Sequence, residues 1–246
     1  MINILFPLAG ENIYFNGSDY LYPKPLIEIS DFPMIQLATE PYRKIKGKKR
    51  FVFVVNQAEC AKYNFDNVLK LLADDSCEVQ ITYLNRPTQG ALCTCMLAWS
   101  KLEKNCPLII ANYDQIVLDD INNYIDYFQS FAADAGTISI ESIHPRWSYV
   151  LVEENNQVVE AAEKRPISKN AIAGIYYYKD AETFINAAIN CIENEASNGG
   201  IYYISSSLNQ LILSNKKVIN LQIPKKKYHS FYSPEKIAEY EMRLHQ

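Results

Sequence analysis

The fold of this chain is decided by the stretch Ile2-Asn3-Ile4-Leu5-Phe6-Pro7-Leu8-Ala9-Gly10, in which a short apolar run leads into a loop of small residues. This pattern predicts a β-strand whose carboxyl end leaves backbone N–H groups free to bind an anion. A second segment, Tyr22-Pro23-Lys24-Pro25-Leu26-Ile27-Glu28, follows closely and sets a lysine in a stretch stiffened by proline. The loop contains neither the dinucleotide-binding pattern G-x-G-x-x-G nor a P-loop, so by itself it does not identify the anion.

Outward from this stretch, short apolar runs alternate with longer helical patterns through the first half of the chain. This alternation predicts βα units and an α/β fold with a mainly parallel sheet. The predicted strands are residues 2–7, 51–55, 79–84 and 108–111, and the predicted helices are residues 34–45 with an interruption at Pro41, 64–73, 91–102 and 121–132. The apolar residues of the second helix share one face, which should cover the sheet: Phe65, Val68, Leu69 and Leu72.

In the second half the predicted strands lie close together, at residues 137–140, 148–152, 158–162 and 172–178. The polar stretch Glu154-Asn155-Asn156-Gln157 predicts a turn between two of them, so we expect an antiparallel or mixed addition to the sheet. Two helices at residues 181–193 and 203–213, a strand at 217–223 and a last helix at 234–244 should follow. Ser233 can cap that last helix, with Pro234 at its first position.

Composition limits the classes of protein to which the chain can belong. Its 246 residues contain 48% hydrophobic and 21% charged side chains, which is typical of a globular protein, and we expect one domain over residues 1–246. The formal net charge of −4 gives no electrostatic reason to expect nucleic acid or an anionic membrane as a partner. Lys225-Lys226-Lys227 is a basic run that can contact a polyanion, but such a run in an acidic protein is more often a solvated loop.

The beginning of the chain and its cysteines predict a soluble, cytoplasmic protein. Met1 is followed at once by the first predicted strand, without a basic leader segment, and no apolar run is long enough for a transmembrane helix. The six cysteines form no C-x-x-C pair and should remain thiols, and the three histidines are too scattered to indicate a metal cluster.

Four further short motifs carry residues suited to chemistry: Thr88-Gln89-Gly90, Asn112-Tyr113-Asp114-Gln115, Glu163-Lys164-Arg165-Pro166, and Ile172-Ala173-Gly174. Asp114 directly follows a predicted parallel strand, at the edge where open α/β sheets bind ligands. Gly90 opens a helix and allows close approach of the backbone. Each motif also has a structural interpretation, since Asp114 can cap a helix, Gly90 can form an ordinary turn, Lys164 can be a surface cation and Gly174 can mark a bulge.

In this order, the motifs resemble those of the sugar-nucleotide pyrophosphorylases, which join a sugar 1-phosphate to a nucleoside triphosphate and release pyrophosphate. The resemblance runs from Leu8-Ala9-Gly10 through Pro23-Lys24-Pro25-Leu26 to Ser233-Pro234-Glu235. Three variants look closest to a branch from bacterial capsule and surface-polysaccharide clusters: Thr88-Gln89-Gly90, Asn112-Tyr113-Asp114-Gln115 and Ile167-Ser168. Some relatives in that branch transfer a cytidylyl group to a small phosphorylated compound that is not a sugar.

The resemblance implies a Rossmann-like, GT-A-type α/β fold with a mixed, mainly parallel central sheet flanked by helices and a small antiparallel addition in the second half. It implies a nucleoside triphosphate and a small phosphorylated acceptor as partners and Mg²⁺ as cofactor, and it is compatible with a homo-oligomer. The residues that would bind the nucleotide are Leu8, Ala9, Gly10, Thr88, Gly90 and Asn112. The catalytic residues would be Lys24, Asp114 and Lys164, with Asp114 as metal ligand, and the acceptor would contact Glu163, Lys164, Ala173 and Gly174.

The chain departs from the family pattern at three positions. The first loop of the family reads G-x-G-T/S-R, but here Asn12 replaces the second glycine and Tyr14 replaces the arginine. A late aspartate that often completes the metal site aligns with Ser230. Three hypotheses therefore stand at this point: an active nucleotidyltransferase, a glycosyltransferase of the related GT-A fold, and a catalytically impaired nucleotide-binding paralogue.

Overall fold

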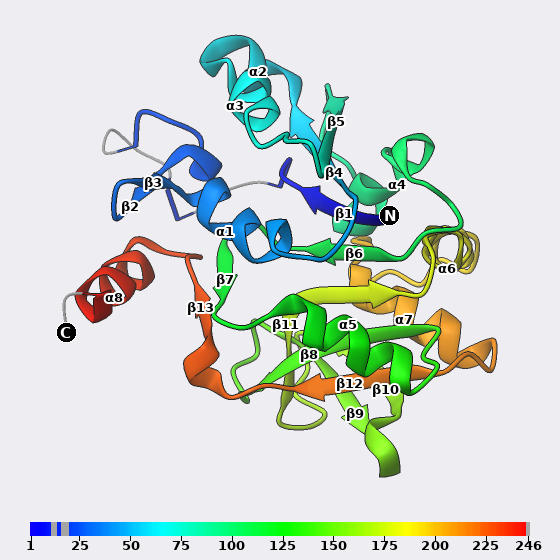
Figure 1. Cartoon of the computed structure of the whole chain (residues 1–246). Coiled ribbons are helices and arrows are strands. Elements are labelled where there is room, and N and C mark those ends of the chain that lie inside the picture. Colours follow the sequence, from blue (N-terminus) through cyan, green and yellow to red (C-terminus); the bar gives the residue numbers. More distant parts are fainter. Residues whose placement is uncertain (11–13, 16–19, 245–246) are drawn as a thin grey trace.

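A nine-stranded mixed sheet forms the centre of the computed structural model, which describes residues 1–10, 14–15 and 20–244 (Figure 1). One run of neighbouring strands has the order β10-β9-β11-β6-β1-β4-β5, while β8 pairs with both β11 and β12. The strand bounds are β1 (Ile2–Pro7), β4 (Lys49–Asn56), β5 (Cys77–Leu84), β6 (Leu108–Ala111), β8 (Ala135–Glu141), β9 (Ser148–Val152), β10 (Val158–Glu163), β11 (Asn170–Tyr178) and β12 (Val218–Gln222).

The strands of the first half are parallel, and those of the second half add an antiparallel part. β1 pairs in parallel with β4 on one side and β6 on the other, so that Leu5 lies beside both Val52 and Ile110. β11 runs antiparallel to β6, β8 and β9, and the pairing of β11 with β8 shifts register between Ile172 and Tyr176. The predicted fold class, a mixed and mainly parallel α/β sheet with an antiparallel addition, is confirmed.

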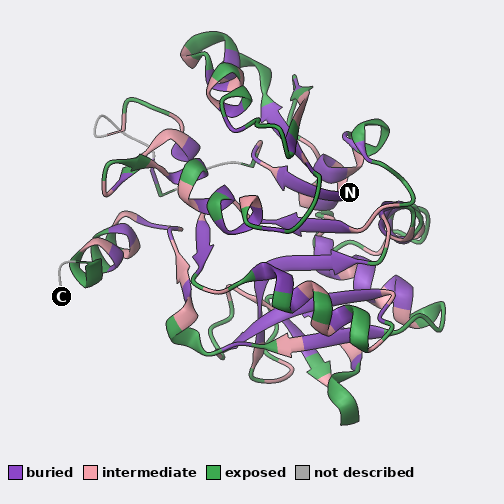
Figure 2. Ribbon diagram, in the orientation of Figure 1, coloured by how far each residue is buried: buried purple, intermediate pink, exposed green. Residues whose placement is uncertain are grey.

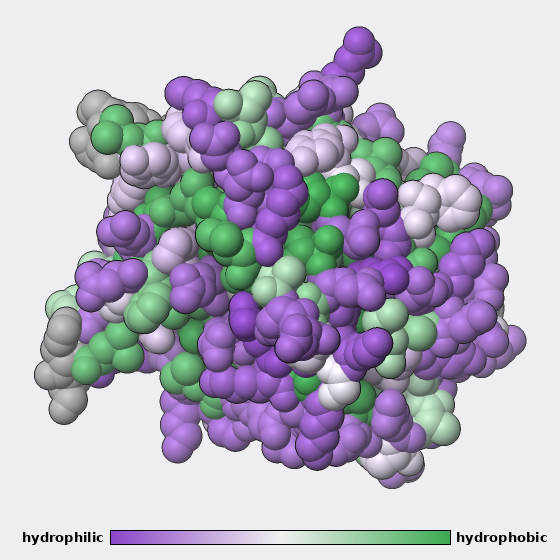
Figure 3. Space-filling model, turned by 45° about the horizontal axis from the view of Figure 1, so that its top comes forward, coloured by the Kyte–Doolittle hydropathy of each residue, from purple (hydrophilic) through white to green (hydrophobic). Residues whose placement is uncertain are grey.

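Helices cover both faces of the sheet, as the alternation of buried residues along β1 requires. Ile4 and Phe6 belong to one hydrophobic cluster with α1 (Met34–Arg43), α3 (Phe65–Lys70) and α5 (Ile121–Ser130). Leu5 belongs to the opposite cluster with α4 (Ala91–Met96), α6 (Ala181–Glu193) and α7 (Ile204–Leu213). Figure 2 shows the central strands as the buried layer between these helices. Figure 3 shows one surface, with hydrophobic groups gathered near its middle and hydrophilic side chains around them.

A third hydrophobic cluster ties the two ends of the described chain together. Phe15, Ile29 and Met34 pack there against Phe231 and Ile237 of the C-terminal region. The small elements in this region are η1 (Lys24–Leu26), the pair β2 (Glu28–Ile29) and β3 (Phe32–Pro33), the pair β7 (Gln115–Val117) and β13 (Tyr228–Ser230), η4 (Lys225–Lys227) and α8 (Pro234–Leu244). The C-terminal segment therefore returns to the edge where β1 and β6 end (Figure 1).

The predicted elements occur in the predicted order, with two corrections. Pro41 does not interrupt the first helix, because α1 continues through it and ends two residues later, at Arg43. The helix predicted at residues 91–102 ends at Met96, and a short 3-10 turn, η2 (Trp99–Lys101), follows. The predicted turn is η3 (Glu154–Asn156). None of the helices in the described ranges has the length and apolar character needed to cross a membrane.

One helix was not predicted at all. α2 (Gln57–Tyr63) begins directly after β4, and the side chain of Asn56 accepts a hydrogen bond from the Ala58 backbone at 2.8 Å. Asparagine at the cap with Glu59 three residues later is a recognisable signal for the start of a helix. This signal was present in the sequence. Because α2 follows β4 directly, Asn56 and Glu59 lie at the carboxyl end of a central strand.

Candidate active site

Gly174 joins two of the predicted motifs by a close backbone contact. It lies at φ +64° in the irregular part of β11. The Asn112 backbone N–H donates to its carbonyl oxygen at 3.0 Å, and the Gln115 side-chain amide donates to the same oxygen at 3.2 Å. A Cβ at this position would lie 2.3 Å from Asn112 Nδ2. The motif after β6 and the motif in β11 therefore need a glycine where they meet.

Gly174→Ala is expected to lower the free energy of unfolding by about 2–4 kcal/mol, because it combines an unfavourable φ with steric overlap. Gly47→Ala is a matched control, since Gly47 also has a positive φ of +79° but has no atom within 4 Å of the added Cβ. That control should cost only about 1 kcal/mol. Urea unfolding of both variants measures the difference, and equal losses would show that the contact with Asn112 carries no energy.

The motifs meet in a cavity of about 380 Å³, which we call the inner chamber. Four of the predicted site residues line it: Asn112, Asp114, Glu163 and Gly174. Tyr14 and Ser230, two of the three departures from the family pattern, also line it. Its other lining residues are Ala91, Gln115, Arg146, Trp147, Ser148, Ile172, Tyr176, Tyr203, Ile204, Tyr228 and Tyr232.

A second cavity of about 340 Å³ lies at the end of β1, and we call it the loop pocket. Three predicted site residues, Leu8, Gly10 and Lys24, line it together with Asn56 and Glu59 of the unpredicted α2 region. Burial raises the pKa of the Glu59 carboxyl. Ala9 lies beside this pocket without lining it and packs against the other face of the sheet.

Lys24 and Asp114 form an ion pair that joins the two cavities. Lys24 Nζ lies 2.6 Å from Asp114 Oδ2, and the two side chains are 8% and 23% exposed. The Lys24 ammonium also lies 5.2 Å from the centre of the Phe15 ring and 5.6 Å from that of Tyr113. Since Lys24 lines the loop pocket and Asp114 lines the inner chamber, this pair marks where ligands in the two cavities would meet.

The donors near Asp114 fit a magnesium ion held largely by substrate and water. Ser230 on β13 pairs with Gln115 on β7, and the Phe231 backbone N–H donates to the Asp114 carbonyl oxygen at 2.7 Å. The aligned position of the missing aspartate is therefore beside Asp114. In the described part of the chain, no three His, Cys, Asp or Glu side chains gather into a metal cluster. Mg²⁺ needs only one or two carboxylates when it also binds phosphates and retains waters, so Asp114 and Ser230 are the residues that would hold it here.

Glu163 lies in the inner chamber, whereas the adjacent Lys164 does not. Glu163 Oε2 accepts hydrogen bonds from the hydroxyls of Ser148 and Ser205. Burial raises the pKa of the Glu163 carboxyl, and these two hydrogen bonds partly oppose the shift. Lys164 is exposed, and its ammonium lies 5.5 Å from the centre of the Tyr203 ring. Of the two residues predicted to contact the acceptor, Glu163 lines the inner chamber and Lys164 lies at the surface.

The pKa shift of Glu163 predicts a specific dependence of stability on pH. A folded-state pKa above its ordinary value of 4.5 means that the folded protein holds the proton more tightly than the unfolded chain. The contribution of this group to the free energy of unfolding is therefore greatest below that value and falls as pH rises through the folded-state pKa. Glu163→Gln should become more stable relative to wild type as pH rises.

Urea unfolding between about pH 4.5 and pH 8 measures this difference. Glu160→Gln is the control, because Glu160 lies on the same strand but is 43% exposed and paired with Arg165. A difference between wild type and Glu163→Gln that stays constant over this range would contradict the prediction.

Thr88, Gly90 and Ala173, three predicted site residues, contact other parts of the chain itself. A Cβ on Gly90, whose φ is +116°, would lie 2.3 Å from the Tyr202 carbonyl oxygen, so the close backbone approach predicted there is made by the chain itself. The Thr88 hydroxyl donates to the Gly90 carbonyl oxygen at 3.0 Å. Ala173 is fully buried in the sheet. Asn12 lies outside the described residues.

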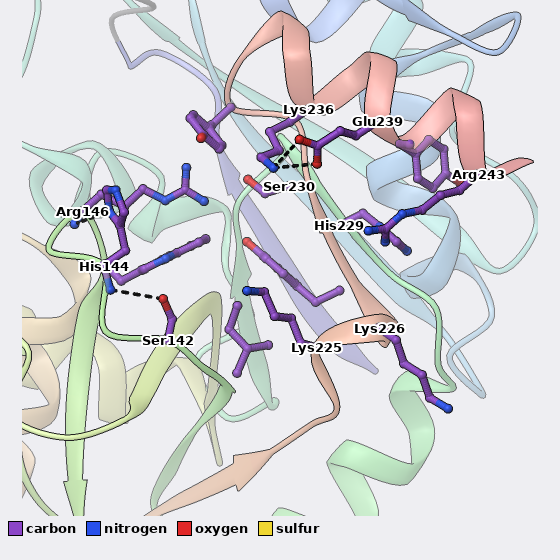
Figure 4. A pocket seen from close by; sticks show the side chains of 15 residues that line it. Ser142, His144, Arg146, Lys225, Lys226, His229, Ser230, Lys236, Glu239 and Arg243 are labelled. Carbon is purple, nitrogen blue, oxygen red and sulfur yellow. Dashed lines mark hydrogen bonds and ion pairs between the residues drawn. The ribbon is translucent and has the colours of Figure 1, made fainter.

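A larger cavity of about 610 Å³ adjoins the inner chamber, and we call it the outer chamber (Figure 4). The two share five lining residues: Arg146, Trp147, Tyr228, Ser230 and Tyr232. The outer chamber is rich in cationic side chains, which are Arg146, Lys225, Lys226, Lys236 and Arg243. Its one carboxylate among the described lining residues, Glu239, pairs with Lys236 at 2.6 Å. Two lysines of the predicted solvated loop therefore border a cavity.

A mixed α/β sheet with polar cavities at the carboxyl ends of its parallel strands is the arrangement in which open α/β proteins bind their ligands. The family can be stated as well, because the family model described as "Nucleotidyl transferase" matches residues 20–221. The chain belongs to the nucleotidyl transferase family.

Solved structures of low sequence identity share the fold. A nucleoside-diphosphate-sugar pyrophosphorylase from Vibrio cholerae RC9 superposes with a TM-score of 0.82 at 19% identity, covering 97% of this chain and 99% of that one. A UDP-glucose pyrophosphorylase complexed with UDP-glucose gives 0.78 at 18% identity, covering 100% and 99%. A UDP-glucose pyrophosphorylase from Acinetobacter baumanii gives 0.77 at 14% identity, covering 99% and 93%. A comparison with curated proteins gave no match.

Proposed function

We propose that the protein transfers a nucleotidyl group from a nucleoside triphosphate to a sugar 1-phosphate or a related small phosphorylated acceptor, and releases pyrophosphate. The observation that carries this proposal is the Lys24–Asp114 ion pair, because it places a cation and a carboxylate where the loop pocket meets the inner chamber. The loop pocket is assigned to the triphosphate and the inner chamber to the acceptor. Membership of the nucleotidyl transferase family supports the class of reaction.

The reaction requires charge neutralisation more than proton transfer. An oxygen of the acceptor phosphate attacks the α-phosphorus, the bond from that phosphorus to the bridging oxygen breaks, and pyrophosphate leaves with the bonding electrons. The attacking phosphate is already ionised near neutral pH, so no general base is needed. Lys24 binds phosphate oxygens at the junction of the two cavities. Asp114, with Ser230 beside it, would hold Mg²⁺, which supplies positive charge to phosphate oxygens.

Pyrophosphate release tests this function directly. The protein is incubated with each nucleoside triphosphate, Mg²⁺ and a panel of sugar 1-phosphates and other small phosphate monoesters. Release that requires one triphosphate and one acceptor together supports the proposal, and the active pair identifies both substrates. Absence of release with every pair would contradict it, whereas tight binding of a nucleotide sugar without binding of any triphosphate would favour a GT-A glycosyltransferase.

A catalytically impaired nucleotide-binding paralogue is the second candidate, and the positions of Tyr14 and Ser230 favour it. Both residues line the inner chamber, where the resemblance predicts an arginine and an aspartate. Tyr14→Arg combined with Ser230→Asp tests this candidate. Activity that appears only in the double variant would support an impaired paralogue, while activity of the native chain would exclude it.

The resemblance also supports a role in capsule or surface-polysaccharide biosynthesis. The motif variants Thr88-Gln89-Gly90 and Asn112-Tyr113-Asp114-Gln115 carry that resemblance. Loss of surface polysaccharide in a strain without the gene, restored by the native gene, is the expected result. An unchanged polysaccharide in such a strain would contradict this role.

A further inference from the structure

The inner chamber has an unusual balance of charge for a site that accepts a phosphorylated compound. Among its described lining residues, Asp114 and Glu163 carry carboxyl groups and Arg146 alone carries a cationic side chain. A phosphate monoester brings about two negative charges near neutral pH and is bound by charged N–H donors. A phosphate in this chamber therefore has one described cationic side chain to bind.

Arg146 is already oriented for such a role. Its guanidinium carbon lies 3.6 Å from the centre of the Tyr232 ring and 4.3 Å from that of Trp147. Stacking on aromatic faces fixes the planar group while its N–H donors remain available at the edge. Figure 4 shows the Arg146 side chain reaching toward the space that the outer chamber occupies. Little conformational entropy remains to be lost when a ligand binds.

Among the described residues, no carboxylate forms an ion pair with the guanidinium of Arg146. The other two cations predicted for the reaction are placed differently, since Lys24 is paired with Asp114 and Lys164 lies at the surface. Within the described part of the site, Arg146 is thus the unpaired cation of the inner chamber.

Tyr14 connects this arginine to the first loop. The Tyr14 ring meets the Tyr232 ring edge-on, with 5.8 Å between the ring centres, and Tyr232 carries Arg146 on its face. Tyr14 stands where the resembling family has an arginine. Tyr232 therefore lies between Arg146, from the loop before β9, and Tyr14 of the first loop.

We propose that Arg146 binds the phosphate of the acceptor in the inner chamber and offsets part of its negative charge during nucleotidyl transfer. The proposal rests on the function proposed above. Two guanidinium N–H groups donate to two phosphate oxygens, and a third phosphate oxygen forms the new bond to the α-phosphorus. The bond between that phosphorus and the oxygen bridging to the β-phosphorus breaks, and pyrophosphate leaves with the electron pair. Arg146 keeps its proton throughout.

Binding of inorganic phosphate tests the site without requiring activity. The chain has two tryptophans, so a Trp99→Phe background leaves Trp147, which contacts Arg146, as the fluorescent reporter. ³¹P NMR line broadening measures the same binding independently of the tryptophan. Arg146→Gln should weaken phosphate binding at least about tenfold. Arg165→Gln is the matched control, because Arg165 is 67% exposed and lines neither chamber among the described residues, and it should bind as wild type does.

The outer chamber provides the competing location for the phosphate. A double variant, Lys225→Gln with Lys226→Gln, removes two of its lysines and leaves Arg146 in place. Phosphate binding should survive in this double variant. Binding that is lost there but retained in Arg146→Gln would overturn the proposal. Equal urea midpoints for Arg146→Gln and wild type would show that any loss of binding is not due to unfolding.

Kinetics separates the role of Arg146 from the proposed function. With an active substrate pair, Arg146→Gln should raise KM for the acceptor at least about tenfold and leave KM for the triphosphate within about twofold. Arg146→Lys should restore part of the loss, because it keeps the charge but not the planar fork. If no substrate pair releases pyrophosphate but phosphate binding still depends on Arg146, the proposed function is contradicted and the phosphate site at Arg146 is supported. Unchanged phosphate binding in Arg146→Gln overturns the site, whatever the activity assay shows.

Discussion

Asp114→Asn is expected to lower the rate of pyrophosphate release by at least about 100-fold, because it removes the carboxylate that lines the inner chamber and pairs with Lys24 of the loop pocket. It also leaves the ammonium of Lys24, which is only 8% exposed, without its partner. Removing one member of a fully buried pair costs about 3–5 kcal/mol. Since Asp114 is partly exposed, we expect a loss of about 1–3 kcal/mol in the free energy of unfolding.

Asp119→Asn is a closely matched control for this variant. Asp119 pairs with Lys227 at the same 2.6 Å and is 21% exposed, but it lines neither the inner chamber nor the loop pocket among the described residues. It should change stability by a similar or smaller amount and leave the rate within about twofold. Pyrophosphate release at several Mg²⁺ concentrations, together with urea unfolding, compares the two. Equal rates for Asp114→Asn and Asp119→Asn would contradict the role of Asp114.

Lys24→Met should lower kcat/KM for the triphosphate by about 10²–10³-fold, because it removes a charge that stabilises the phosphates at the junction. Methionine keeps much of the side-chain volume between the Phe15 and Tyr113 rings, so the packing around position 24 should largely remain. Initial rates at varied triphosphate concentration measure the effect. Lys227→Met, which removes the partner of Asp119, should leave kcat/KM near the wild-type value.

Combining Lys24→Met with Asp114→Asn separates stability from catalysis. The two residues are in contact, so their effects on the free energy of unfolding should not add, and the double variant should be more stable than the sum predicts. Its activity should remain as low as that of the weaker single variant. Strict additivity in the free energy of unfolding would show that the ion pair makes no net contribution to the fold.

Much of the site could be predicted because it follows strand ends. Leu8 and Gly10 follow β1, Asn112 and Asp114 follow β6, and carboxyl ends of parallel strands meet at one edge of a sheet. Local sequence is enough to identify such strands, because side-chain periodicity and length separate them from helices. The position of Glu59 could also have been predicted, since the sequence contains the cap signal at the start of α2.

Other parts of the site depend on residues that are distant in the chain. Arg146 stacks on Tyr232, and Ser230 joins the site through the pairing of β13 with β7. No local sequence pattern around either residue predicts which residue it contacts. These contacts form only when the C-terminal segment packs against the strand ends. Thr88 and Gly90 show the converse, since a pattern suited to ligand binding is used here for contact with Tyr202 and the helix that follows.

The sequence by itself determined the order of strands and helices, the mixed sheet and the edge at which the site lies, because these depend on periodicity and on short-range turn and cap residues. Tertiary structure decided which charges meet. Lys24 and Asp114 are 90 residues apart and become an ion pair, while the adjacent Glu163 and Lys164 are divided between chamber and surface. Charge pairing acts over a few ångströms in space, and spacing along a chain does not specify that distance.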